Sequence, residues 1–240
     1  MMRLNPGGLR AVLAGIGLLI AAAASGAPKV PLRVEMDLVV EAKGMTVGEG
    51  RDVFETDGKR YSVTTEARTT GLARLLKKVD ERRDSQGLVT DKGLQPLNFR
   101  QKRTGKPPNA ADFDWARGEL TMTEGDEVEK VALVPMTFDQ ASLPYAFVFS
   151  DPPATGRLSV RVTDGRKLQE YDLAFVGRER IDTALGELDT LHYRKVQPPG
   201  DKRGFEFWLG IGHHRLPVRI RIVEKDGTAF DSTVTRIVYP

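Results

Sequence analysis

The three histidines of this sequence are the side chains with the widest chemical scope, and they lie at His192, His213 and His214. Imidazole exchanges protons near neutral pH and binds metals, but a metal site needs several imidazoles or carboxylates that converge on one point. Neighbouring residues of an extended strand point to opposite faces, so His213 and His214 can act together only in a turn. We therefore interpret all three as loop or sheet-edge residues and predict no metal site.

Asp139, Ser142 and one histidine have the residue types of a hydrolytic triad. A nucleophilic serine is often carried on a Gly-x-Ser-x-Gly turn, and the sequence has no such motif. Asp and Ser at this spacing also suit a turn, because their short side chains hydrogen-bond nearby backbone groups. We therefore predict no catalytic residue and no cofactor, and expect Asp139 to cap a helical turn that packs the aromatic residues of 145–149 inward.

Trp208 is the residue that most directly suggests a binding surface. Strand alternation through residues 205–209 places Phe207 on one face with Phe205 and Leu209, which we expect to be buried, and Trp208 on the other. A tryptophan on that second face suits either the wall of a pocket or a second packed layer. Arg219 and Arg221 alternate with core residues and would form a cationic stripe beside it. We predict a ligand-binding role for Trp208, Arg219 and Arg221, with plain packing and a solvated face as the alternative.

Alternation of apolar and polar residues with period two dominates the chain. It is clearest in residues 32–42 and recurs in residues 158–162 and 218–222. Tight-turn dipeptides separate such runs, as antiparallel hairpins require; they are Asp57-Gly58, Gly125-Asp126, Asp164-Gly165 and Asp226-Gly227. Almost no segment has the helical spacing that parallel crossovers need. The sequence predicts an all-β, mainly antiparallel fold: one domain built as a curved or barrel-like sheet, with one or two short helices.

A short amphipathic helix is predicted for residues 71–79. Its apolar residues follow the spacing i, i+3, i+4 and i+7, and they are Leu72, Leu75, Leu76 and Val79. Arg74, Lys77 and Lys78 lie on the other side. We expect this helix to cover an open end of the sheet with its apolar face.

The N-terminal residues have the order of a secretory signal. Arg3 and Arg10 precede an apolar run over residues 11–24, and small residues follow at 25–27. We predict a signal peptide over residues 1–26 and a periplasmic domain over residues 27–240, although cleavage after Ala24 or Ala27 fits nearly as well. The alternative is a retained anchor, which the short apolar run disfavours because a spanning helix needs about 20 apolar residues. No cysteine follows that run to carry a lipid.

Composition limits the partners of the predicted mature chain. Removing Arg3 and Arg10 leaves 34 basic against 33 acidic side chains, and the two signs are interleaved, so nucleic acid is not an expected partner. No second apolar span follows the leader, so the mature chain should contain no integral membrane segment. The absence of cysteine means that the core alone must stabilise an exported domain.

Fragments spread over most of the predicted mature chain form one further pattern. In order they are Gly93-Leu-Gln-Pro-Leu-Asn-Phe99, Asp112-Phe-Asp-Trp115, Asp139-Gln-Ala-Ser142, Asp164-Gly165, residues 171–177, residues 183–186, Phe205-Glu-Phe-Trp208, Leu216-Pro-Val-Arg-Ile220 and Asp226-Gly227. Through them the chain resembles DUF3108, a family of exported bacterial proteins of unknown function. The resemblance implies an envelope location, a curved antiparallel β architecture and no known reaction. Residues 210–214 depart from it, because a more acidic stretch would be expected there.

The architecture predicts a non-enzymatic envelope protein that holds an apolar or amphipathic ligand, lipid-like in character, or an envelope partner in the concavity of its sheet. Two alternatives remain: a structural or assembly factor of the cell envelope, and a hydrolase of envelope glycans or lipids. A cavity with apolar walls favours the first, an exposed apolar patch over a filled core the second, and a polar cleft with convergent carboxylates or histidines the third.

We predict that the exported protein begins between Ser25 and Pro28, because the small-residue junction ends there. Intact-mass measurement of the protein recovered from the periplasm tests this. A recovered chain that still carries residues 1–24 would contradict both the cleavage and the predicted release from the membrane.

Overall fold

The computed structural model of the chain describes residues 32–151 and 155–240. The predicted signal peptide lies outside the described residues. Strands dominate the described part, with one short α-helix and two 3-10 helices. The strands are β1 (Arg33–Ala42), β2 (Met45–Thr56), β3 (Arg60–Thr69), β4 (Asp80–Thr90), β5 (Gly93–Arg103), β6 (Asn109–Asp114), β7 (Glu119–Glu124), β8 (Glu127–Ala132), β9 (Thr137–Asp139), β10 (Arg157–Thr163), β11 (Leu168–Thr183), β12 (Gly186–Lys195), β13 (Gly204–Gly210), β14 (Leu216–Val223) and β15 (Ala229–Val238); the helices are α1 (Gly71–Leu76), η1 (Leu143–Val148) and η2 (Ile211–His213).

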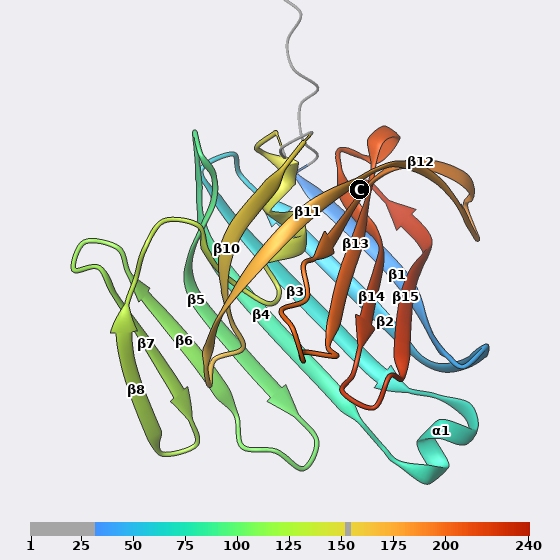
Figure 1. Cartoon of the computed structure of the whole chain (residues 1–240), viewed down its shortest axis with the longest axis horizontal. Helices are drawn as coiled ribbons and strands as arrows, with labels where there is room; N and C mark the ends of the chain where they lie inside the picture. The colour runs from blue at the N-terminus through green and yellow to red at the C-terminus, as the bar shows by residue number, and fades with distance from the viewer. Residues whose placement is uncertain (1–31, 152–154) are drawn as a thin grey trace, which may run out of the picture.

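All described strands belong to one sheet, in the order β8-β7-β6-β5-β4-β3-β2-β1-β15-β14-β13-β12-β11-β10-β9. Neighbours are antiparallel except β9 and β10, which are parallel. The first strand pairs with the last, so β1 and β15 join an N-terminal half of the sheet to a C-terminal half. Figure 1 shows the sheet curling so that β10, β11 and β13 lie across β3 to β5. The predicted all-β, barrel-like antiparallel architecture is confirmed.

The hairpins form where the sequence predicts them, because all four tight-turn dipeptides lie between paired strands. The turn at Gly165 does more than reverse the chain. Its carbonyl accepts a hydrogen bond from the Thr123 N–H (3.0 Å), and a Cβ at Gly165 would lie 2.9 Å from the backbone N of Ala110. This close approach brings the β10–β11 turn onto β6 and β7, so the two halves of the sheet meet there.

The alternation predicted for residues 32–42 is present in β1, where Val34, Met36 and Leu38 are buried. They belong to a large apolar cluster drawn mainly from β1 to β7. A second cluster lines the C-terminal half, where the rings of Tyr193 and Phe207 both stack on Phe147 of η1. Both clusters lie under the curl of a single sheet, so the sheet supplies most of its own core.

The predicted helical turn after Asp139 is η1, and every residue from Leu143 to Val148 is buried. Ser142 occupies the N-cap position, three residues beyond Asp139. Asp139 instead closes the preceding turn: its Oδ1 accepts hydrogen bonds from the backbone N–H groups of Ala141 (2.9 Å) and Ser142 (2.8 Å). The expectation of an inward-packing turn is confirmed, and Asp139 stabilises its start rather than the helix itself.

The predicted amphipathic helix forms as α1, but it is shorter than expected and its leucines do not cover the sheet. Leu72, Leu75 and Leu76 are 78%, 83% and 89% exposed, and no residue of α1 is buried. The expectation that this helix covers the end of the sheet with its leucines is therefore wrong. The helix ends before Val79 because Lys77 and Lys78 return to extended backbone toward β4.

Replacing Phe207 by alanine should lower the free energy of unfolding by roughly 3 to 5 kcal/mol, as truncation of core aromatics does. Phe207 is fully buried, and its ring packs against both Phe147 and Tyr193. Phe205→Ala in the same strand is the control, since Phe205 is only half-buried and should cost clearly less. Chemical denaturation of the three proteins measures both losses; equal losses would show that Phe207 carries no special share of the core.

Candidate functional site

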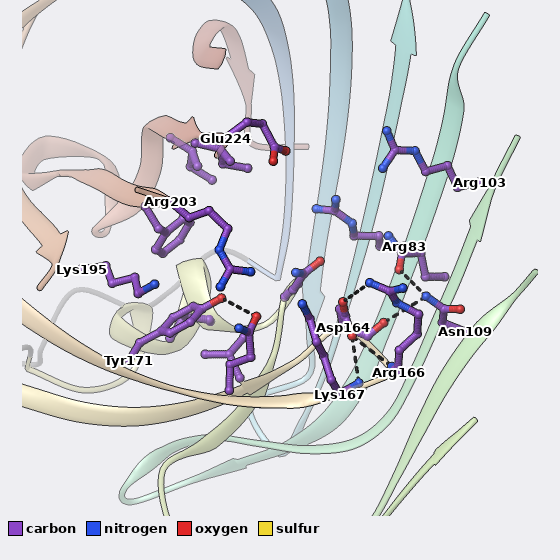
Figure 2. Close-up of a pocket in the computed structure, with 18 of the residues that line it drawn as sticks. Arg83, Arg103, Asn109, Asp164, Arg166, Lys167, Tyr171, Lys195, Arg203 and Glu224 are labelled. Atoms are coloured by element: carbon purple, nitrogen blue, oxygen red, sulfur yellow. Dashed lines mark hydrogen bonds and ion pairs between the residues drawn. The ribbon is translucent and has the colours of Figure 1, made fainter. Parts of the chain in front are cut away.

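A cavity of about 460 Å³ lies between the inner face of β4 to β6 and the strands β10 to β14 (Figure 2). Its volume lies within the range of small-molecule sites, about 300 to 1,000 Å³. The strands that form its walls come from both halves of the sheet, so it exists only because the sheet curls. The β10–β11 turn and the loop after β5 contribute to its mouth.

One wall of the cavity is apolar. Its side chains continue the second core cluster toward solvent, and they are Leu143, Val162, Phe205, Ile220 and Ile222. Phe205 was expected to be buried but is half-buried because it faces this cavity. Tyr171 stacks at an angle on Phe205, with ring centroids 6.4 Å apart. The hydrocarbon part of a ligand can pack against this wall.

The remaining wall is strongly cationic. Seven lining side chains are basic and three are acidic. The basic ones are Arg83, Arg103, Lys106, Arg166, Lys167, Lys195 and Arg203, and the acidic ones are Glu124, Asp164 and Glu224. Among the described residues the ammonium groups of Lys106 and Lys167 have no ion-pair partner. The cavity is therefore a site of positive potential.

Asp201 organises the cations at one end of the cavity. Its carboxylate accepts hydrogen bonds from Lys195 Nζ (2.8 Å) and Arg203 Nε (3.1 Å). These contacts hold the pKa of Asp201 well below its usual range. Lys195 Nζ also lies 4.8 Å from the ring centre of Tyr171. Two cations share one carboxylate here, so this group of three side chains carries a net positive charge beside the apolar wall. Figure 2 shows the Arg203 side chain directed into the cavity.

Two buried polar atoms in cavity-lining residues have no hydrogen-bond partner within the described residues. They are Arg83 Nε and Asn109 Oδ1. The Arg83 guanidinium pairs with Glu81 through another nitrogen, and the Asn109 amide donates to Gln101 Oε1 (3.2 Å). Buried polar atoms are nearly always satisfied by protein or solvent. Both atoms are themselves enclosed, so a bound water is the partner that fits them best.

The buried acids lie deeper, where the two halves of the sheet meet. Asp139 is fully buried, and its Oδ2 accepts a hydrogen bond from the Ser85 hydroxyl of β4 (2.7 Å). Burial raises the pKa of Asp139 to about 6. Asp52 of β2 accepts a hydrogen bond from the Tyr145 hydroxyl (2.7 Å), and burial raises its pKa too. Both carboxylates cross-link η1 and its turn to the N-terminal strands.

The structure does not bring a histidine to Asp139 and Ser142. His192 instead lies between two other carboxylates, with Nδ1 3.0 Å from Glu179 and Nε2 2.8 Å from Glu206. The Ser142 hydroxyl stays within its own turn, 3.1 Å from the Asp139 N–H. The interpretation of Asp139 and Ser142 as turn residues is confirmed; the link from Asp139 to Ser85 was not foreseen.

Trp208 and Phe207 point to opposite faces of β13, as alternation predicts, and they belong to different core clusters. Trp208 is only 3% exposed, so its ring is packed against neighbouring side chains and not open to solvent. Its ring stacks on His192 at 4.2 Å, and its Nε1 donates to Glu179 Oε2 (2.7 Å). Both contacts come from the β11–β12 hairpin, whose strand β12 pairs directly with β13 and places His192 opposite Trp208.

Arg219 and Arg221 lie on the Trp208 face and outside the cavity. Both donate to Asp231 of β15, at 2.7 Å and 2.9 Å, and Arg219 Cζ also lies 4.7 Å from the ring centre of Trp208. The predicted cationic stripe beside the tryptophan is present, and Asp231 neutralises part of it. The cavities found among the described residues are not lined by Trp208, Arg219 or Arg221, so ligand binding by these three residues stays a prediction.

His213 and His214 do sit in a turn, the condition required for joint action, and both rings contact Tyr239. In residues 32–151 and 155–240, no group of three or more His, Cys, Asp and Glu side chains is arranged to hold a metal ion. These two histidines therefore contact an aromatic ring, and the described residues place no third metal-ligating side chain beside them.

The sequence interpretation missed the cavity residues, although one signal was available. Lys195 follows Tyr193 at an inward position of β12, and Arg83 precedes Ser85 at an inward position of β4. Charged side chains in phase with core residues indicate either a paired interior charge or a polar cavity. Which of the two applies depends on the facing strand, and alternation within one strand contains no such information.

Comparison with known proteins agrees with the fold. A family model described as "Protein of unknown function (DUF3108)" matches residues 29–235. No curated protein matches the chain. The chain is similar in structure to a beta-barrel-like protein of domain of unknown function DUF1849 from Brucella abortus, with a TM-score of 0.53, 9% identity, and coverage of 87% of this chain and 97% of that one. At that identity the similarity concerns the fold alone.

We expect Asp139 to make the stability of the protein depend on pH. Its folded pKa of about 6 exceeds the value of about 4 in an unfolded chain, so its contribution is complete at low pH and is lost as pH rises through 6. The stability advantage of the wild type over Asp139→Asn should therefore shrink by about 2 kcal/mol between pH 4.5 and pH 7.5.

Urea denaturation of both proteins at the two pH values measures this difference. Asp201→Asn provides a comparison of opposite sign, because the pKa of Asp201 is lowered and its stabilisation is lost toward acid pH. A constant difference between wild type and Asp139→Asn across this range would show that the carboxyl titrates normally.

Proposed function

Because the chain belongs to the DUF3108 family, whose description names no activity, we propose its function from the cavity: it is a periplasmic binding protein for an amphipathic ligand with an anionic head and a hydrocarbon tail. The observation that carries this proposal is the pairing of an apolar wall with a cationic wall inside one curled sheet. The periplasmic location rests on the predicted signal peptide over residues 1–26.

The two walls favour an amphiphile over a purely apolar or purely ionic ligand. Tyr171 and Phe205 continue the core, so a hydrocarbon chain placed against them would lose contact with water. Arg203 and Lys195 lie beside the same rings and keep positive charge there through Asp201. A neutral lipid would leave one carboxylate to balance these two cations, whereas a carboxylate or phosphate head would pair with the excess positive charge.

Arg83 and Asn109 support the same polarity. The Arg83 guanidinium lines the cavity and adds a cationic donor to it. Arginine and carboxylate or phosphate groups match in geometry as well as in charge. Asn109 Oδ1, the unpaired acceptor nearby, would receive a hydroxyl or amide hydrogen of the ligand or of a bound water.

The hydrolase alternative has little support from the described residues. The Asp139 carboxylate is enclosed by Ser85, Ala141 and Ser142, and no imidazole reaches it. Within the described residues, no helix has the length and apolar character needed to cross a bilayer.

The test is a comparison of three twelve-carbon ligands, dodecanoate, dodecyl phosphate and dodecanol, by isothermal titration below their aggregation limits. Dodecanoate and dodecyl phosphate should bind, and dodecanol should bind more weakly. The double variant Lys106→Glu, Lys167→Glu should weaken binding of both anions by about tenfold or more, since it places two negative charges at the mouth. Its melting temperature should change little, because neither ammonium group has an ion-pair partner among the described residues.

The matched control is Lys59→Glu, Lys92→Glu, which makes the same charge change in exposed turns outside the cavity lining. It should leave the affinities near wild type. If dodecanol binds as tightly as dodecanoate, or if this control weakens binding as strongly as the double variant at Lys106 and Lys167, the proposed recognition of an anionic head is wrong.

A further inference from the structure

Helix α1 carries a small apolar surface that the fold leaves uncovered. We call Leu72, Leu75 and Leu76 the leucine tip; their exposed fractions, 78%, 83% and 89%, are the largest among the exposed large apolar residues of the described chain. Single exposed apolar residues are normal on proteins, but three adjacent leucines on one helical turn are not. Figure 1 shows α1 projecting beyond the strands at one end of the sheet.

Hydrogen bonds to β2, β3 and β4 hold the backbone of the leucine tip in place. The Thr70 N–H donates to the Val47 carbonyl (3.0 Å), which attaches the start of the helix to β2. Arg74 Nη1 donates to the Thr69 carbonyl (3.2 Å) and to Asp80 Oδ1 (2.9 Å), which attaches its middle to β3 and β4. These contacts hold the backbone while all three leucines point to solvent.

The charged side chains of the segment that carries the tip are all basic. Residues 71–79 contain Arg74, Lys77 and Lys78 and no acidic residue. The nearby carboxylate of Asp80 is shared by Arg74 and Lys78, at 2.9 Å and 3.7 Å. Lys77 has no ion-pair partner among the described residues. Leucines that project between free or half-neutralised cations match the surface of an anionic bilayer, which offers hydrocarbon beneath negative head groups.

The size of the tip favours a lipid surface over a folded protein partner. A specific protein interface buries roughly 800 Å² on each side, and one six-residue helix cannot present that area. Binding to a bilayer requires no minimum contact area and no complementary shape. A few inserted apolar side chains can therefore contribute to binding, together with electrostatic attraction between basic side chains and anionic lipids.

The tip is also connected to the rim of the cavity. The Thr104 N–H donates to the Asp80 carbonyl (2.9 Å), and the Asp80 N–H donates to Thr104 Oγ1 (3.1 Å). Arg103 and Lys106, on either side of Thr104, line the cavity. They also line a second, open hollow of about 1,120 Å³ that extends to Thr70 and Asp80 at the foot of α1. Docking of α1 on a membrane would therefore bring these cavity residues close to the lipid head groups.

We propose that the leucine tip inserts into the head-group region of an anionic bilayer, with Lys77 and Lys78 paired to lipid phosphates. The surface lies outside the cavity, so this inference holds or fails apart from the proposed ligand binding. It assigns α1 the role of a reversible membrane contact.

The test is co-sedimentation of the protein, expressed as the full chain and checked by intact mass, with vesicles of phosphatidylglycerol and phosphatidylethanolamine or of phosphatidylcholine alone. The wild type should bind the anionic vesicles at low salt and bind phosphatidylcholine at least tenfold more weakly. Leu72→Gln, Leu75→Gln, Leu76→Gln should lose at least tenfold in binding while its melting temperature is unchanged, since no residue of α1 is buried. Lys77→Glu, Lys78→Glu should lose the preference for anionic lipid.

The control variant is Val128→Gln, Val176→Gln, Leu185→Gln, which removes three exposed apolar side chains elsewhere and should bind like the wild type. The leucine variant has the same N-terminal residues as the wild type, so any lipid binding by the leader cancels in the comparison. Dodecanoate affinity of the leucine variant should be unchanged, which separates this surface from the cavity.

Equal vesicle binding by the wild type and the leucine variant would overturn the proposal. So would a wild-type dimer in sedimentation velocity that the leucine variant dissociates without any vesicle binding, because the tip would then contact a second copy of the chain.

Discussion

The structure depends on one constraint: a single sheet of fifteen strands must bury its inner face against itself. Antiparallel hairpins alone would give an open, twisted ribbon with two unpaired edges. The contact that fixes the curl is polar. Ser85 of β4 donates to the buried carboxylate of Asp139, the last residue of the edge strand β9, and the Tyr61 hydroxyl lies 3.2 Å from that of Ser85. A buried hydrogen-bonded pair is directional, so it sets where the two halves meet, whereas apolar packing alone would allow them to slide.

This closure explains why the cavity is amphipathic. The inward side chains of the same strands change character along their length: β4 passes from Ser85 to Arg83, and β12 from Tyr193 to Lys195. On the side of Ser85 and Tyr193 the facing strands are close and the interior is filled with aromatic rings. On the other side the cavity lies between the facing strands, and charged side chains line it beside the apolar wall. The transition between these two zones is the cavity.

Much of the fold could be predicted because alternation and turn chemistry are local. The strands at residues 32–42 and 218–222 and all four glycine turns are where the sequence places them. The errors concern what lies opposite a residue. Trp208 was assigned correctly to the face opposite Phe207, yet its burial depends on His192 and Glu179 from a long hairpin. The leucines of α1 have an amphipathic pattern, and nothing in that pattern states whether a partner surface exists. Alternation defines faces, and only topology defines what covers them.

The distribution of charge suggests why the open side of the barrel tolerates so many cations. Lys195 and Arg203 share Asp201, and Arg83 and Arg103 share Glu81, whereas Arg166 lies between Asp164 and Glu124. Lys106 and Lys167 have no ion-pair partner among the described residues, so basic groups exceed acidic ones around the cavity, and their mutual repulsion raises the free energy of the cavity when no anion is bound. A bound anion would remove that repulsion without any change in backbone. A closed core on one side of the sheet can thus stabilise the fold while the other side keeps an excess of positive charge, and the proposed binding of an anionic ligand rests on that excess.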